Sequence, residues 1–405
     1  MNDASPEQGD LLEALDCQPG HSRPHDLLEH LVLMKGEKEV AMRHPLCRRS
    51  PLLAALVFLV LIASRPAGAQ GIYTITDLGT LNPGDQSCQA LGINNYGQVA
   101  GFCVPVGDTA HAFLWTPDTP NGTTGQMIDL GRSSSGFDGG FKVNDYGQVL
   151  FNALVQTFAG IQSQAFLWTP DTPNGTTGAA VSLGGLTGPD GVSNGYGINN
   201  LGQIAGFSYP GVCFLWTPDN PNGITGTYNS YFNGTHYEPG FGYSSHDGDA
   251  FAVNDLSQVT GSFGGYPIIH NDPSFHYTDA DVINADLRGI GYAINAAGHV
   301  AGGAVFASTG AVRPFFYGGT MIDISPGGGS GNAYGINGLD EVVGSAGSGG
   351  AFMYSGGTTA YLIDLIDSGT GWLQLRDAYA INDSGQIVGV GVISGGLHAF
   401  LMTPR

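Results

Sequence analysis

The sequence predicts an all-β fold, a seven-bladed β-propeller built from seven four-stranded repeats of 41–55 residues. The first observation is a short motif, typified by Ile381-Asn382-Asp383-Ser384-Gly385-Gln386-Ile387-Val388-Gly389, that has six variants upstream. Its copies are spaced by 50, 55, 55, 41, 42 and 45 residues, which indicates a repeat architecture. The second is that each repeat contains short strand-like segments and glycine-rich turns without helical periodicity, as propeller blades do.

The repeated motif predicts a β-hairpin. Asn at its first turn position and Gly at its fourth suit a type I turn followed by a left-handed residue. The Asn side chain can cap its own turn, and Gly adopts a positive φ without steric cost. We therefore expect a structural role for seven turn asparagines: Asn94, Asn144, Asn199, Asn254, Asn295, Asn337 and Asn382.

Two further strands complete each repeat. One follows the hairpin and is typified by His111-Ala112-Phe113-Leu114-Trp115; the other precedes it and carries Asp-Leu-Gly, as in Ile75–Gly79. Small residues before the turn Asn suit the crowded centre of a propeller, so we place that strand innermost and the Asp-Leu-Gly strand outermost. Residues 73–79 would then complete the blade that holds residues 398–402 and hide its sheet edge. The rival architecture is an elongated β-solenoid, for whose coils repeats of this length are long.

The motifs together resemble those of a known family. Ile-Asn-x-x-Gly-Gln-Val-x-Gly, His-Ala-Phe-Leu-Trp and Asp-Leu-Gly-Thr-Leu are similar to the repeats of the bacterial HAF-repeat proteins. The resemblance covers residues 72–404 in seven copies. It implies an extracellular protein with a repeat-built β domain, and it transfers no catalytic residue.

The first 69 residues do not follow the repeat pattern. We interpret residues 1–41 as a non-native upstream extension, with translation starting at Met42, or as a disordered leader. Residues 42–69 resemble a signal peptide, with arginines, an apolar run and Ala67-Gly68-Ala69. The run is shorter than the roughly 20 residues that span a bilayer. We expect cleavage after Ala69 and a secreted or extracellular protein, or a periplasmic one, without a transmembrane anchor in the mature chain.

Residues 70–405 form one acidic propeller domain in this interpretation. They contain 6 basic and 25 acidic residues, so their net charge is −19. Such a charge disfavours nucleic acid and anionic lipid as partners. It suits solubility and the binding of cations or neutral polymers. We expect a monomer that has no cofactor.

Three cysteines remain after cleavage, namely Cys88, Cys103 and Cys213. Cys88 and Cys103 flank the first hairpin. The expected hairpin register places position 88 opposite position 104, which puts the two sulfurs on opposite faces of the sheet. The sequence therefore slightly disfavours this disulfide, and the odd count leaves at least one thiol unpaired or intermolecular. No Cys/His spacing typical of a metal site occurs.

Some repeat features have both a functional and a structural interpretation. The Asn-Asp turns could be calcium loops, but calcium takes six to eight oxygens, so we interpret them as hairpin turns. The segment from Trp115 to Gly125 recurs twice and either presents Asp and Asn on one rim or simply connects strands, which we favour. His111 and His398 share a strand position, and we interpret them first as strand residues.

The clearest departure from the repeat pattern lies between residues 226 and 250. Aromatic side chains beside His, Asn and carboxylates suit a sugar-binding surface, although such loops are also common surface filler. The candidate ligand-binding residues are Tyr231, His236, Tyr237, Tyr243, His246, Asp247 and Asp249. Glu238 with Asp247 is the first acid–base pair to test. We assign no catalytic residue, since no activated nucleophile or converging acid–base set is visible.

The sequence thus predicts an exported binding or scaffold module for a glycan or a cell-surface protein, and we expect binding rather than catalysis. One alternative is a polysaccharide-active hydrolase or lyase with its site near residues 226–250. The other is a purely structural protein of the envelope or matrix. The fold alone does not choose among these, because propellers serve all three roles.

Overall fold

A computed structural model describes residues 71–107, 109–132, 141–158, 160–209, 212–230, 237–238, 242–243, 248–271, 281–306, 310–393 and 396–405. These residues form an all-β, propeller-like fold of mostly four-stranded antiparallel sheets. We number the repeats as units 1 to 7 in the order of their turn asparagines. Within the described residues, no helix has the length and hydrophobicity that crossing a membrane would require.

The strands recur in the same order in each unit. The first strands, which lead to the turn Asn, are β2 (Asp85–Ile93), β6 (Lys142–Val143), β10 (Ser193–Ile198), β16 (Gly248–Val253), β19 (Gly289–Ile294), β23 (Asn332–Ile336) and β27 (Trp372–Ile381). The second strands are β3 (Val99–Pro105), β7 (Val149–Thr157), β11 (Ile204–Ser208), β17 (Val259–Phe263), β20 (Val300–Val305), β24 (Val342–Ser345) and β28 (Ile387–Ile393).

The third strands are β4 (His111–Pro117), β8 (Gly160–Pro170), β12 (Val212–Pro218), β18 (Tyr266–His270), β21 (Val312–Tyr317), β25 (Ala351–Ser355) and β29 (Gly396–Pro404). The fourth are β5 (Gly125–Arg132), β9 (Gly178–Ser182), β13 (Gly226–Ser230), β22 (Met321–Asp323), β26 (Thr358–Tyr361) and β1 (Tyr73–Asp77). Unit 4 has three strands among its described residues, and β14 (Tyr237–Glu238) pairs with β15 (Gly242–Tyr243) separately. Short 3-10 helices are η4 (Pro326–Gly328), η5 (Gly347–Gly349) and η6 (Leu362–Leu365).

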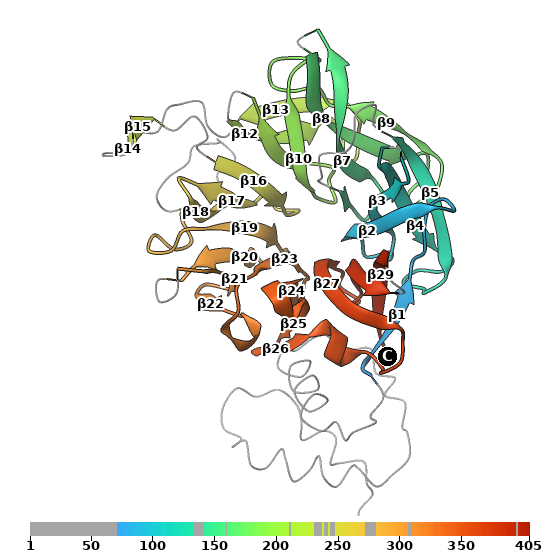
Figure 1. Ribbon diagram of the computed structural model, residues 1–405. Helices are drawn as coiled ribbons and strands as arrows, with labels where there is room; N and C mark the ends of the chain where they lie inside the picture. Colours follow the sequence, from blue (N-terminus) through green and yellow to red (C-terminus); the bar gives the residue numbers. More distant parts are fainter. Residues whose placement is uncertain are drawn as a thin grey trace, which may run out of the picture. The chain divides into compact units, whose positions relative to one another are not determined.

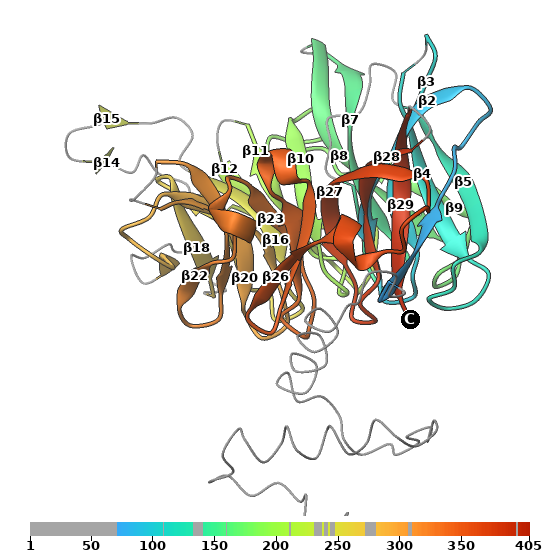
Figure 2. The same cartoon turned by 60° about the horizontal axis from the view of Figure 1, so that its bottom comes forward.

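The units lie side by side around a common centre, with their first strands innermost (Figure 1). Each first strand contacts the first strand of the next unit, and β27 of unit 7 contacts β2 of unit 1. Figure 2 shows the same sheets tilted, with the strands of units 1 and 7 next to each other. The prediction that the strand before the turn Asn is innermost is therefore correct, and this position explains its small residues.

The two ends of the described chain share one sheet. β1 pairs antiparallel with β29, from Tyr73 opposite Pro404 to Asp77 opposite Phe400. Beyond the strand, the Leu78 N–H donates to the Ala399 carbonyl at 3.0 Å. The outer strand of unit 7 is thus supplied from the start of the repeat region, as the sequence predicts, and it covers the edge of β29.

The glycine that closes the hairpin motif in six of the seven units is required by close packing. A Cβ at Gly101 would lie 1.9 Å from the Gln89 carbonyl oxygen and 2.8 Å from the Phe113 ring. Equivalent clashes arise at Gly206 and Gly389. The ring that blocks this space is the buried Phe of the third strand, so glycine and phenylalanine are two parts of one packing unit.

The register predicted for the first hairpin is wrong, because it omits a β-bulge. Ile93 pairs with Val99, as the turn dictates, but the register then shifts between Ala90 and Gly92. The extra residue, Leu91, places Cys88 opposite Cys103 instead of position 104, and the two cysteines form a disulfide. The third cysteine, Cys213, is buried as a free thiol, and burial raises its pKa.

Candidate functional site

The predicted ligand-binding patch of unit 4 lies mostly outside the described residues. Four of its members fall there: Tyr231, His236, His246 and Asp247. Tyr237 and Tyr243 are paired in the register of β14 and β15. Asp249 lies on β16, the innermost strand of unit 4. Among the members of the patch that the structure describes, Asp249 is thus the residue on an innermost strand.

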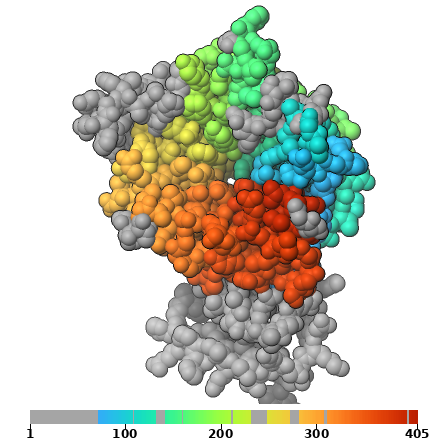
Figure 3. Space-filling model, viewed as in Figure 1, coloured from blue at the N-terminus to red at the C-terminus, as the bar shows by residue number. Residues whose placement is uncertain are grey.

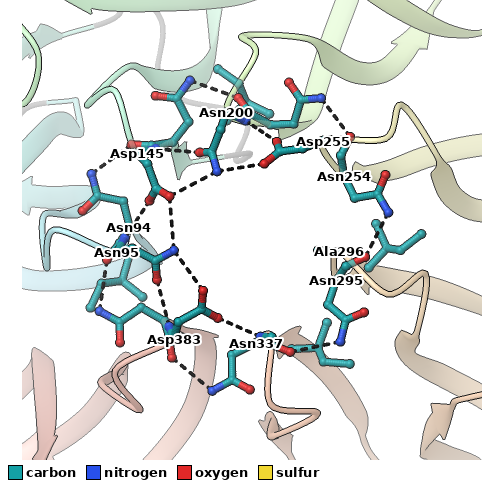
Figure 4. Close-up of a pocket in the computed structure, with 18 of the residues that line it drawn as sticks. Asn94, Asn95, Asp145, Asn200, Asn254, Asp255, Asn295, Ala296, Asn337 and Asp383 are labelled. Carbon is teal, nitrogen blue, oxygen red and sulfur yellow. Dashed lines mark hydrogen bonds between the residues drawn. The ribbon is translucent and has the colours of Figure 1, made fainter. Parts of the chain in front are cut away.

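The turn asparagines shape their own turns and join neighbouring units. Oδ1 of Asn94 accepts the N–H groups of Tyr96 and Gln98 at 3.1 and 2.8 Å, and the other six repeat this pattern. Each Nδ2 donates to the carbonyl of the next turn Asn at 2.9–3.1 Å. Since Asn382 donates to Asn94, the seven bonds form a closed circuit (Figure 4). All seven asparagines are buried.

A pocket of about 290 Å³ lies inside this circuit. The Ile or Val before each turn Asn contributes an apolar part of its wall. The residue after each turn Asn contributes the rest: Asn95, Asp145, Asn200, Asp255, Ala296, Gly338 and Asp383. The pocket is therefore built from the same three repeat positions in every unit.

Carboxylates and carboxamides alternate around part of this pocket (Figure 4). Nδ2 of Asn95 donates to Asp145 at 3.1 Å and to Asp383 at 3.2 Å. Nδ2 of Asn200 donates to Asp145 and Asp255, both at 3.1 Å. An amide thus stands between each pair of neighbouring carboxylates, which offsets their mutual repulsion. The row is interrupted at Ala296 and Gly338, which contribute no polar side-chain group.

These carboxylates are not arranged as a metal site. Calcium would need six to eight converging oxygens, whereas the oxygens of Asp145 accept N–H groups from both neighbouring units. Within the described residues, the one group of His, Cys, Asp and Glu with its ligand atoms close together is Asp85, Cys88 and Cys103. Its two cysteines form a disulfide and so offer no thiolate.

The repeated loops of units 1 to 3 have a structural role. Asn121 adopts a left-handed φ of 58°, and its N–H donates to the Tyr96 carbonyl at 2.8 Å. Its side-chain and backbone oxygens accept from Asn382 and Gln386, both at 3.1 Å. Asn174 and Asn222 make the equivalent contacts to the preceding units. These loops therefore connect strands and also lock adjacent turns together.

Units 5 and 6 replace these contacts with ionisable groups. Asp340, at a position that is usually Gly, accepts from Asn295 at 2.8 Å and pairs with Nδ1 of His299 at 2.7 Å. Glu341, at a position that is usually Gln, accepts from Asn337 at 2.7 Å. Burial raises the pKa of Glu341, and the Asp383 carboxylate raises it further, against the hydrogen bonds from Asn337 and Ser355.

The histidines of the third strand pair with the Asp-Leu-Gly carboxylates. Nδ1 of His111 lies 2.9 Å from Asp129, and Nδ1 of His398 lies 2.9 Å from Asp77. Arg313 and Asp323 form the same cross-strand pair in unit 5 at 2.8 Å. The two sequence motifs are thus partners across a sheet, which agrees with interpreting the histidines as strand residues.

The innermost strands also carry an aromatic row that was not predicted from the sequence. In units 3 to 7 the third residue before the turn Asn is the bulged residue of the hairpin, and it is aromatic and partly exposed. We call these five residues the aromatic belt: Tyr196, Phe251, Tyr292, Tyr334 and Tyr379. Unit 2 also has an aromatic residue at this position, Phe141, but it is buried in the core that units 1 and 2 share. Aligning the seven motifs by their Asn would have found this position, but strands such as Ala333–Ile336 appeared simply small and apolar.

Comparisons with known proteins give no family. No protein-family model matches the chain, and no curated protein matches it. Among solved structures, it is similar to the acylaminoacyl peptidase of Pyrococcus horikoshii, with 10% identity, a TM-score of 0.39, and coverage of 73% of this chain and 48% of that one. Trypanosoma rangeli sialidase shows 10% identity and a TM-score of 0.38, with 82% and 59% covered.

A third similar structure is the β-propeller domain of the Trilobed protease from Pyrococcus furiosus. It shows 10% identity and a TM-score of 0.30, and the match covers 79% of this chain and 84% of that one. The chain spans about half the length of the peptidase and about three fifths of the sialidase.

Proposed function

We propose that the chain is an exported, seven-bladed β-propeller of the HAF-repeat type that acts as a binding module for a glycan. The observation that carries this proposal is the closed circuit of seven turn asparagines. Such a circuit supports an arrangement of seven blades and would hold the central side chains in place before a ligand arrives. Preorganisation of this kind lowers the entropic cost of binding.

The chemistry at the centre supports a glycan as the partner. Carboxamides, carboxylates and aromatic rings occur together on the innermost strands, and these groups recognise hydroxyls and the apolar faces of sugars. The signal-peptide pattern and the acidic composition of residues 70–405 support export. We propose a monomer, since the circuit closes within one chain.

A glycan array probed with purified residues 70–405 tests this proposal. We expect saturable binding to at least one class of polysaccharide, confirmed by titration of the free oligosaccharide. The Tyr237→Ala/Tyr243→Ala variant, tested alongside, shows whether the predicted patch of unit 4 contributes. The absence of saturable binding to any glycan would contradict the proposed function.

A further inference from the structure

We propose that the aromatic belt is the binding site for a neutral pyranose oligosaccharide, whose apolar sugar faces pack on its rings. This inference rests on the proposed function and makes it specific, because it names the site and the class of sugar. The site is distinct from the pocket inside the asparagine circuit, whose lining includes no belt residue.

The belt is a continuous surface that runs from unit 3 to unit 7. Successive ring centroids lie 5.0, 5.2, 5.6 and 5.5 Å apart, within the range at which aromatic rings attract. All five residues are partly buried, so each keeps some accessible surface. Because the belt lies on the innermost strands, we infer that its accessible parts face the hollow at the centre of the units (Figure 3).

Polar side chains accompany the belt on the same strands. Two residues before a belt residue, four of the five units carry Asn194, Asp249, Asn332 or Asp377. Nδ2 of Asn332 lies 3.4 Å from the Tyr334 hydroxyl, to which it donates. Burial raises the pKa of Tyr379, and the Asp377 carboxylate raises it further. Its phenol therefore stays protonated and can donate a hydrogen bond to a ligand.

This combination fits a chain of sugars. A pyranose has an apolar C–H face that packs on an aromatic ring and a rim of hydroxyls that bonds to carboxylates and carboxamides. Five rings in a row can contact several successive sugars. The carboxylates of Asp249 and Asp377 would repel an anionic polymer, so a neutral one is favoured.

The rings are not needed simply to form the strand. Unit 1 has Leu91 at the belt position, and its first strand keeps the same bulge and pairing. Leu91 and Phe102 pack against the core cluster that units 1 and 2 share. Leucine therefore occurs naturally at this position. Replacing a belt residue with Leu removes the ring and keeps apolar volume.

The test is calorimetric titration of the neutral oligosaccharide that binds best on the array. We expect Tyr334→Leu to weaken binding roughly tenfold and the Tyr334→Leu/Tyr379→Leu variant to weaken it further. Tyr334→Phe should keep most of the affinity, since it keeps the ring. Tyr209→Leu is the matched control, because Tyr209 is 66% exposed and not part of the belt. Unchanged melting temperatures would show that the variants are folded.

The outcomes separate this inference from the proposed function. Wild-type affinity in the folded double Leu variant would refute the belt as the site and leave glycan binding intact. Belt-dependent binding of an anionic glycan or of polylysine, without binding of a neutral glycan, would refute the ligand class. No glycan binding at all would remove the proposed function and this inference with it.

Discussion

At the scale of single residues, Glu341 places a carboxylate at a position where most units have a neutral Gln. In five units the fourth residue after the turn Asn is Gln, whose Oε1 accepts from that Asn, as Gln386 does from Asn382 at 3.1 Å. The Gln amide also donates to a hydroxyl, as Gln386 does to Thr403. Glu341 keeps the first bond but has no proton to donate when ionised. It is therefore a carboxylate in a site built for a neutral amide.

Replacing Glu341 with Gln should stabilise the protein in a pH-dependent way. The raised pKa means that the folded state holds the proton more tightly than the unfolded chain. The free energy of unfolding therefore falls as pH rises from the unfolded pKa through the folded one. We expect Glu341→Gln to gain about 1 kcal/mol at neutral pH and much less in acid, where Glu341 is protonated. Urea unfolding at several pH values measures this.

Gln386→Glu is the matched control for this prediction. It places a carboxylate in the equivalent site of unit 7, so it should destabilise the protein increasingly as pH rises. A Glu341→Gln protein with wild-type stability at neutral pH would show that ionised Glu341 is well solvated in the folded state.

At the scale of elements, the hairpin is where prediction from sequence succeeds and then fails. The turn is local, and Asn94 and Gly97 determine it together, with Gly97 at a φ of 90°. The bulge at Leu91 is not local, because it depends on how closely neighbouring first strands approach. A Cβ at Gly92 would lie 3.1 Å from the Cα of Lys142 in the next unit. The sequence of one hairpin does not contain this contact, so the disulfide could not be predicted from it. The aromatic belt is visible in the sequence only when the seven motifs are aligned.

The disulfide between β2 and β3 should stabilise the domain. Cys88 and Cys103 are separated by 15 residues, and a loop of this length corresponds to about 3 kcal/mol of lost denatured-state entropy. We expect the Cys88→Ala/Cys103→Ala variant to lose about this much free energy of unfolding, as measured by urea titration. Dithiothreitol should lower the stability of the wild type and leave the variant unchanged. Cys213→Ala, which removes the free thiol, should keep the response to reductant; a wild type insensitive to reductant would contradict the prediction.

At the scale of the whole molecule, the periodicity of the sequence predicts the order of strands, but it predicts only some of the contacts that join the first and last units. The bond from Asn382 to Asn94 joins residues 288 positions apart, and it is possible because the first strands of units 7 and 1 contact each other. The pairing of β1 with β29 could be predicted, because each end of the repeat region lacks what the other supplies. The candidate site was harder to predict. The sequence prediction placed it in unit 4, which departs from the repeat pattern, whereas the belt residues occupy a position within that pattern.

The pairing of β1 with β29 gives the last prediction, which concerns closure. Residues 80–405 should unfold at a lower temperature than residues 70–405, because they lack β1 and expose the edge of β29. Tyr73 is 5% exposed, and losing its burial alone costs about 2–3 kcal/mol. The free edge should also promote association, which light scattering at increasing concentration would detect. A peptide of residues 70–79 added in excess should restore the melting temperature. Equal melting temperatures for the two proteins would mean that β1 covers the edge without holding the ends together, and the asparagine circuit would then be sufficient for closure.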